Sequence, residues 1–238
     1  MKNLRLAVTA IIAGTVVSGT ATAAIMVSGA VGGAPSGVIL DNLDWLALGS
    51  AGGTGGSGIT VNFTPNAQTV QGAVGGQYAA PFLSGGNGTG FGSPNQPNGV
   101  DATHYITTGS TGAVRGAAAE ILLPGYSSGA SYYYFGLLWG SVDNYNTLSL
   151  YDGTTLVGSV TGSQVVASPN GDQGVNGTLY VNMTSSLAFN RIVATSAQYA
   201  FEFDNIAFSR TIPTPEPGSL ALLGLGLMGL GFARRRLS

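Results

Sequence analysis

The 238-residue chain contains no cysteine. It can therefore form neither disulfide bonds nor a thiolate metal site, and it cannot carry a lipid anchor on a first mature cysteine. It also has a single histidine, His104. The usual zinc sites need cysteines or several histidines, so they are excluded, and no metal or other cofactor is required by the residues present.

Charged residues are also scarce. They make up only 8% of the chain, whereas an ordinary soluble domain carries about 25%. Eight lysines and arginines stand against ten acidic residues, which leaves no basic face for a nucleic acid. With 44% hydrophobic residues the chain can bury a core, which argues against disorder. Glycine is abundant, at 39 residues, but without the three-residue period of collagen.

Residues 1–23 have the three-part layout of a secretory signal peptide. Lys2 and Arg5 supply the positive start, an apolar run follows, and Ala21 and Ala23 give the small residues that signal peptidase accepts. We expect a helical signal segment that directs the chain to the Sec translocon and is cleaved after Ala23 or one residue later. The alternative, a buried N-terminal helix, fits poorly with a short apolar run that ends in small residues.

The C-terminus carries three unlike features in order. They are a Pro-Glu-Pro motif (Pro215, Glu216, Pro217), a short apolar stretch (219–233) and an arginine cluster (Arg234, Arg235, Arg236). A helix from Leu220 to Ala233 would be about 21 Å long, shorter than the roughly 30 Å hydrocarbon core of a membrane. As a permanent span it is marginal. The arginines should stay on the cytoplasmic side, which places the rest of the chain outside.

This order of features resembles the PEP-CTERM sorting signal of Gram-negative bacteria. The resemblance implies recognition by exosortase, a membrane-embedded cysteine peptidase that removes the tail, and a setting of extracellular polysaccharide and biofilm. It implies export, transient anchoring in the inner membrane through the C-terminal hydrophobic helix, and then a location at the cell surface or outside the cell. An ordinary tail anchor that happens to follow two prolines is the alternative.

The sequence thus divides into four parts: a signal peptide (1–23), one domain (24–210), a Pro-rich spacer with the PEP motif (211–218), and a hydrophobic helix with the arginine cluster (219–238). Most positive charge belongs to the two ends. The body keeps only three arginines against nine acidic residues, a net charge near minus six. Such a domain should be repelled by anionic polymers unless cations bridge the two.

The body of the chain predicts an all-β domain, because short apolar or alternating runs are separated by Gly, Asn, Ser and Pro. The expected strands are 59–63, 69–74, 104–108, 118–123, 132–139, 147–151, 155–160, 165–167, 178–183, 191–195 and 201–208. This number of short strands indicates a two-sheet, jelly-roll-like β-sandwich. Asp152-Gly153 is the best hairpin turn, and the glycine-rich stretches 49–58 and 84–99 are predicted to be surface loops.

Residues 132–208 also resemble one subgroup of exosortase-dependent surface proteins, in the stretches 134–143, 145–148 and 200–206. The resemblance implies family membership and no particular activity. The last stretch is similar to the closing strand of several carbohydrate-binding sandwiches, although such a strand recurs in many β-sandwich proteins.

Candidate catalytic residues are few, and we predict that the chain is not an enzyme. His104 has no nucleophile elbow to serve and is better interpreted as a histidine at a strand edge. Glu202 and Asp204 would share one face of a strand and could form a glycosidase pair. A β-bulge or strand end at Asp204-Asn205 explains the same pattern without chemistry.

Two binding hypotheses remain. Loops with Asp143, Asn146, Asn170 and Asp172 carry the oxygen ligands that a structural calcium ion prefers, although Asx turns account for them equally well. The aromatic run at 132–139 is the other candidate. Alternation predicts one face with Tyr133, Phe135, Leu137 and Trp139, and another with Tyr132, Tyr134 and Leu138. Tyr132 and Tyr134 could stack on sugar rings; a central strand buried on both faces is the simpler interpretation.

The leading hypothesis is an exported structural or adhesive protein of the surface or biofilm matrix, in contact with exopolysaccharide. A carbohydrate-binding module is the alternative, and a glycan hydrolase is a third.

Overall fold

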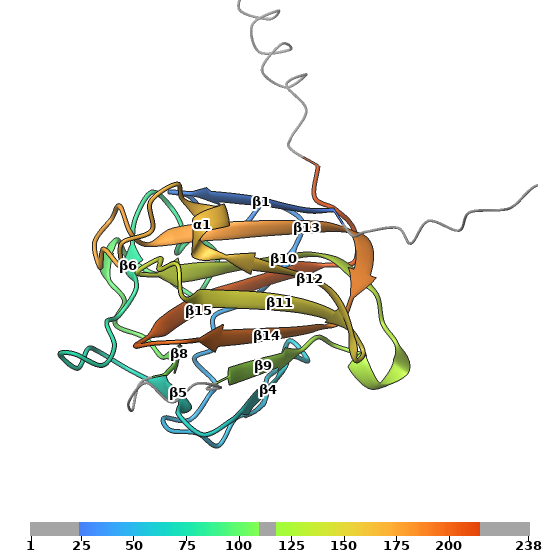
Figure 1. Ribbon diagram of the computed structural model, residues 1–238, viewed down its shortest axis with the longest axis horizontal. Coiled ribbons are helices and arrows are strands. Elements are labelled where there is room, and N and C mark those ends of the chain that lie inside the picture. Colours follow the sequence, from blue (N-terminus) through green and yellow to red (C-terminus); the bar gives the residue numbers. More distant parts are fainter. Residues whose placement is uncertain (1–23, 110–117, 215–238) are drawn as a thin grey trace, which may run out of the picture.

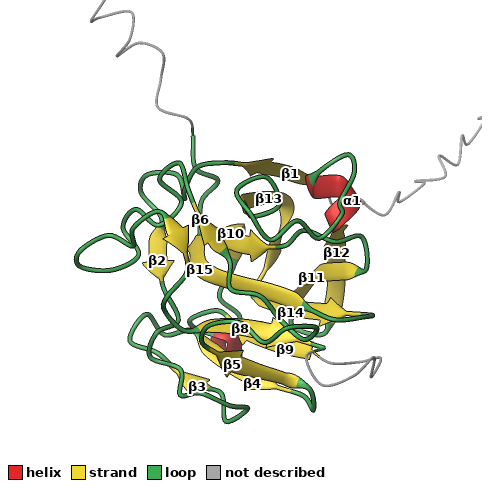
Figure 2. Ribbon diagram, turned by 90° about the vertical axis from the view of Figure 1, so that its left-hand side faces the viewer, coloured by secondary structure: helices red, strands yellow, loops and turns green. Residues whose placement is uncertain are grey.

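Two antiparallel sheets packed face to face form the domain (Figures 1 and 2). The computed structural model describes residues 24–109 and 118–214. The all-β prediction is confirmed in this part of the chain. The predicted signal helix, the PEP motif and the hydrophobic C-terminal helix lie outside the described residues.

The first sheet runs in the order β1 (Ile25–Ala30), β13 (Leu179–Phe189), β10 (Tyr132–Gly140), β15 (Phe201–Ser209), β8 (Tyr105–Thr108) and β5 (Ala67–Val70), with β2 (Ile39–Asp41) also paired to β15. The second sheet runs β12 (Thr155–Thr161), β11 (Asn146–Asp152), β14 (Arg191–Ser196), β9 (Ala118–Leu122), β4 (Thr60–Phe63) and β3 (Gly53–Thr54). A small hairpin joins β6 (Phe82–Leu83) to β7 (Gly99–Val100), and two short helices are η1 (Tyr126–Ser128) and α1 (Gly162–Val165).

The connectivity from β8 to β15 is that of a jelly roll. Successive strands alternate between the two sheets except at the β11–β12 hairpin, and they form two four-stranded units, β8-β15-β10-β13 and β9-β14-β11-β12. The earlier strands β1 to β5 extend these units at their edges or pair beside β15.

Most predicted strands are present, with two exceptions. Residues 165–167 are not a strand, because Val165 ends α1 and Val166 caps that helix by donating its backbone N–H to the Gly162 carbonyl. The strand predicted at 69–74 lies earlier, at Ala67–Val70. The β11–β12 hairpin is confirmed, but its turn lies one residue later than predicted. Asp152 pairs with Thr155, so the two turn residues are Gly153 and Thr154, and of these only Gly153 has a positive φ, +56°.

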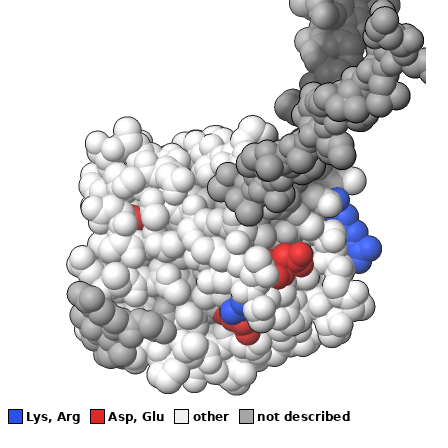
Figure 3. Space-filling model, turned by 45° about the vertical axis from the view of Figure 1, so that its right-hand side comes forward, with Lys and Arg blue, Asp and Glu red and all other residues white. Residues whose placement is uncertain are grey.

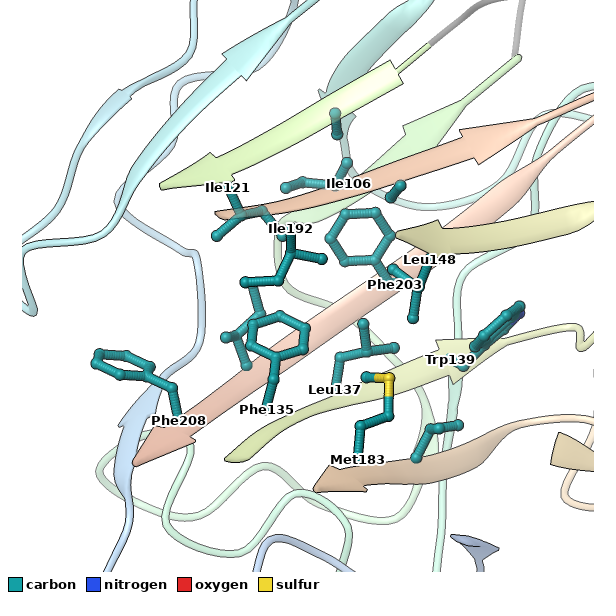
Figure 4. Packing of buried hydrophobic residues seen from close by; sticks show 14 of the residues in the cluster. Ile106, Ile121, Phe135, Leu137, Trp139, Leu148, Met183, Ile192, Phe203 and Phe208 are labelled. Carbon is teal, nitrogen blue, oxygen red and sulfur yellow. The ribbon is translucent and has the colours of Figure 1, made fainter. Parts of the chain in front are cut away.

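The main hydrophobic core lies between the two sheets (Figure 4). Phe135, Leu137 and Trp139 of β10 all face it, as alternation predicts. Trp139 packs on Phe201 of the neighbouring strand, with ring centroids 4.4 Å apart. These large buried side chains fix β10 and β15 as the centre of the first sheet.

The outer face of the first sheet is also covered. Tyr134 and Leu138 of β10 join Tyr180 of β13 in a second apolar cluster, which includes Phe91 from the glycine-rich stretch 84–99. This stretch is therefore more than a surface loop: Phe91 is 1% exposed and packs on the sheet.

Candidate functional site

A polar pocket of about 350 Å³ lies at one end of the first sheet. Its wall comes from four segments far apart in the sequence: 73–79, 141–145, 170–173 and 199–202. Its aromatic residues are Tyr78, Tyr145 and Tyr199, and its side-chain amides are Gln77, Asn170 and Gln173. The pocket thus combines aromatic and hydrogen-bonding groups.

Glu202 forms the buried floor of this pocket. It lies near the start of β15 and is 3% exposed. Oε1 accepts a hydrogen bond of 2.9 Å from the backbone N–H of Ala79, and Oε2 accepts one of 2.7 Å from Ser141 Oγ. Desolvation by burial raises the pKa of Glu202 from 4.5 to about 7, although both hydrogen bonds act in the opposite direction. Through these two hydrogen bonds Glu202 ties two wall segments to the sheet.

Asp143 and Tyr145 make a second polar group in the pocket wall. The Tyr145 hydroxyl lies 2.6 Å from Asp143 Oδ2 and 2.6 Å from the carbonyl oxygen of Tyr199. Partial burial raises the pKa of the Asp143 carboxyl. Gly171, with φ +67°, brings the 170–173 turn against this carboxylate, and a Cβ there would lie 2.9 Å from Asp143 Oδ1. The turn and Asp143 therefore close one side of the pocket together.

The pocket and the route to the C-terminus lie at opposite ends of β15. Glu202 is at the pocket, while Ser209 ends the strand seven residues later. At about 3.3 Å per residue this separation is about 23 Å. The segment after β15 leaves the domain at the right of Figure 1. The described part of the domain thus presents its pocket away from its C-terminal attachment.

Tyr132 and Tyr134 are not a sugar-stacking platform, because both are only 1% exposed. Their hydroxyls bond inside the domain, at 2.8 Å to the Pro124 carbonyl and 2.7 Å to Asn182 Oδ1. A register shift between the two residues turns Tyr132 into the main core, against Phe208, rather than to the face of Tyr134. The simpler interpretation, a buried central strand, therefore holds.

The four residues predicted to bind calcium do not all meet. Asp143 and Asn170 both line the pocket. Asn146 is fully buried and bonds to Ser196 and Ala200, and Asp172 accepts the backbone N–H of Gly174 in a tight turn. Within residues 24–109 and 118–214, no three His, Cys, Asp or Glu side chains gather into a group that could hold a metal ion.

The two residues of the predicted glycosidase pair do not share a site. Glu202 lines the pocket, but Asp204 is fully buried and does not. The expected bulge directly follows Asp204 in β15. Gly136 pairs with Ala207 but Leu138 pairs with Asp204, so β15 carries one extra residue between these pairs. His104 stands just before β8, where its Nδ1 lies 2.9 Å from the carbonyl oxygen of Leu46.

Sequence reasoning did not identify Tyr78, Tyr199 or Ser141 as pocket residues. No local motif marks them, because the pocket exists only once β10 and β15 bring their ends together. The available signal was indirect: the predicted turns around Asp143 and Asn170 do contribute to the wall.

Comparison with protein families matches residues 213–236 to the PEP-CTERM protein-sorting motif. Comparisons with curated proteins and with solved structures find no match. In the described ranges no helix is both long and apolar enough to cross a membrane.

This match indicates an exported protein with a C-terminal sorting signal that anchors it transiently in the membrane. More particularly, the chain carries a PEP-CTERM motif and is thereby a substrate for exosortase-dependent sorting.

Proposed function

We propose that this chain is a non-enzymatic structural or adhesive protein of the cell surface or extracellular matrix. The observation that carries the proposal is the arrangement along β15, with the pocket at one end of the strand and the sorting motif following from the other. A protein held by its C-terminal side would direct the pocket outward. This is the arrangement that an adhesive domain needs.

The state of the acidic residues supports a non-enzymatic role. A glycoside hydrolase needs two carboxyl groups that flank a bound sugar, with at least one free to exchange a proton with it. Both carboxyl groups that line the pocket are engaged in holding its wall: Glu202 accepts hydrogen bonds from Ala79 and Ser141, and Asp143 accepts one from the Tyr145 hydroxyl. Asp204, the other member of the predicted pair, is buried outside the pocket.

A second candidate function, carbohydrate binding, is favoured by the pocket lining. Tyr199 is 40% exposed and lines the pocket together with the amides of Asn170 and Gln173. Aromatic faces and amides suit the apolar faces and hydroxyl groups of sugars. The face of the domain shown in Figure 3 carries only a few charged side chains, and a surface of low charge suits a neutral polymer. In this proposal the sugar-binding residues are Tyr199 and the other pocket residues, not Tyr132 and Tyr134.

The direct test mixes the purified exported protein with exopolysaccharide from the producing culture. We expect the protein to sediment with the polymer while the polymer keeps its chain length. Shortening of the polymer would contradict the non-enzymatic role, and failure to sediment would contradict the adhesive one.

The pocket assignment is tested by Tyr199→Ala, which should weaken polymer binding at least tenfold. The matched control is Tyr126→Ala, because Tyr126 is a half-buried tyrosine in η1 that does not line the pocket. Equal polymer binding by the two variants would show that the pocket is not the binding site.

A further inference from the structure

A second polar site lies on the outer face of the first sheet, outside the pocket. Strand β15 pairs on one side with β8 at residues 201–203 and with β2 at residues 206–208. The pairing is interrupted between them, at Asp204 and Asn205, where the bulge lies and Asn205 takes φ +51°. The segment carrying Asp101 meets β15 at this interruption.

A chain of hydrogen bonds joins this interruption to Asp101: Asn205 Nδ2 donates to Gln96 Oε1, Gln96 Nε2 donates to Thr103 Oγ1, and Thr103 Oγ1 donates to Asp101 Oδ1. The carboxyl groups of Asp204 and Asp101 lie close enough to affect each other's charge. Asp204 is fully buried, and neither of its oxygens has a hydrogen-bond partner of good geometry in the described part of the chain; the nearby backbone N–H of Asn205 lowers the pKa of this carboxyl only in part. Asp101 is 1% exposed. Its Oδ1 accepts two bonds from Thr103, at 2.9 Å from the backbone N and 2.6 Å from Oγ1, while its Oδ2 has no donor.

No basic side chain compensates this pair within the described part of the chain. Arg191 bonds to Glu120 at 2.6 Å, and Arg210 lies over the ring of Tyr132. The Nδ1 atom of His104 lies 2.9 Å from the carbonyl oxygen of Leu46 and not at either carboxyl group. Asp44, which is exposed, adds a further negative charge nearby.

Two buried carboxyl groups in contact can both remain charged only if a cation lies between them; otherwise one of them takes up a proton. Burial and the neighbouring Asp101 raise the pKa of Asp204 well above its ordinary value, because both disfavour a negative charge on this group. The unpartnered atoms here are oxygens: both of Asp204, Oδ2 of Asp101 and Oδ1 of the adjacent Asn205, which is itself fully buried. An all-oxygen set of this kind suits a hard cation.

We propose that Asp204 and Asp101 bind a calcium ion on the outer face of the first sheet, with the side-chain oxygen of Asn205 as a further ligand. Calcium is favoured over magnesium because it accepts irregular sets of carboxylate, amide and backbone oxygens, whereas magnesium demands a near-ideal octahedron. The ion would join the end of the 84–103 segment to β15. It would thus hold in place the loop that covers the outer face.

The test uses the purified exported protein, first freed of divalent ions with a chelator. Addition of millimolar calcium should raise Tm by about 5 °C or more, and terbium, used as a luminescent calcium substitute, should bind with one site per chain. Asp204→Asn and Asp101→Asn should each weaken terbium binding at least tenfold. The matched control, Asp172→Asn, alters an acid that is already satisfied by a turn and should leave binding unchanged.

Each remaining outcome overturns the proposal. If the wild-type chain shows neither a Tm shift nor terbium binding, the two carboxyls share a proton instead. If binding survives both Asp204→Asn and Asp101→Asn but is lost in Asp143→Asn, the cation site lies in the pocket wall. Terbium binding to the wild-type chain is measured directly, so the test does not depend on the stability of any variant.

Discussion

The hydroxyl of Ser141 donates a 2.7 Å hydrogen bond to Oε2 of Glu202. Ser141 directly follows β10, and Glu202 lies near the start of the adjacent strand β15. The bond therefore joins the two central strands where they end at the pocket. It also places a carboxyl group in a buried position, which makes Glu202 sensitive to pH.

The stability of the domain should fall as the pH rises through the titration range of Glu202. Burial raises the pKa of this group from 4.5 to about 7, so the folded state binds its proton more tightly than the unfolded state does. The favourable effect of protonation is complete below about pH 4.5 and lost above about pH 7, a change of up to about 3 kcal/mol. Urea unfolding at pH 5 and pH 8 measures it.

The control is Glu202→Gln, which keeps the shape and removes the titration. The difference in unfolding free energy between pH 5 and pH 8 should shrink by most of that amount in the variant. An unchanged difference would show that another buried acid, such as Asp204, is responsible.

Gly136 should tolerate no side chain. A Cβ at this position in the middle of β10 would collide with the Tyr134 hydroxyl and would lie 2.9 Å from Cε1 of Tyr180. We expect Gly136→Ala to lower the unfolding free energy by about 1–3 kcal/mol, because the two rings must shift. Gly56→Ala is the control: nothing lies within 4 Å of its Cβ position, and the change there should be close to zero. Chemical denaturation compares the two variants.

Tyr132 should contribute to stability and not to binding. Its hydroxyl donates to the Pro124 carbonyl inside the domain. Tyr132→Phe removes this bond and should cost about 1 kcal/mol of unfolding free energy, while polymer binding stays the same. A loss of polymer binding with unchanged stability would restore the aromatic run as a binding surface.

Local pattern was sufficient to predict the centre of the fold. Alternation placed Phe135, Leu137 and Trp139 in the core because the strand period of two is obeyed there. The same rule was wrong for Tyr132, because the register shift ahead of Tyr134 breaks the period. The strand predicted from the short apolar run at 165–167 was also wrong, because Val165 ends α1 and Val166 caps it.

The sites could be predicted less well, because they depend on contacts between distant segments. Asp101 and Asp204 are far apart in sequence and meet only because β8 and β2 leave a gap beside the bulge of β15. The pocket likewise needs the ends of β10 and β15 together. By contrast, the sorting motif is a contiguous sequence signal that functions through its order, and it could be predicted in full.

Mass spectrometry of the exported protein tests the central claim most directly. Exosortase-dependent sorting through residues 213–236 predicts a mature chain that begins at or next to Ala24 and ends near Pro215-Glu216-Pro217, without the arginine cluster. Replacing Glu216 with alanine should leave the tail in place and hold the protein in the membrane fraction. An exported, surface-located protein that is intact through Ser238 would contradict the account.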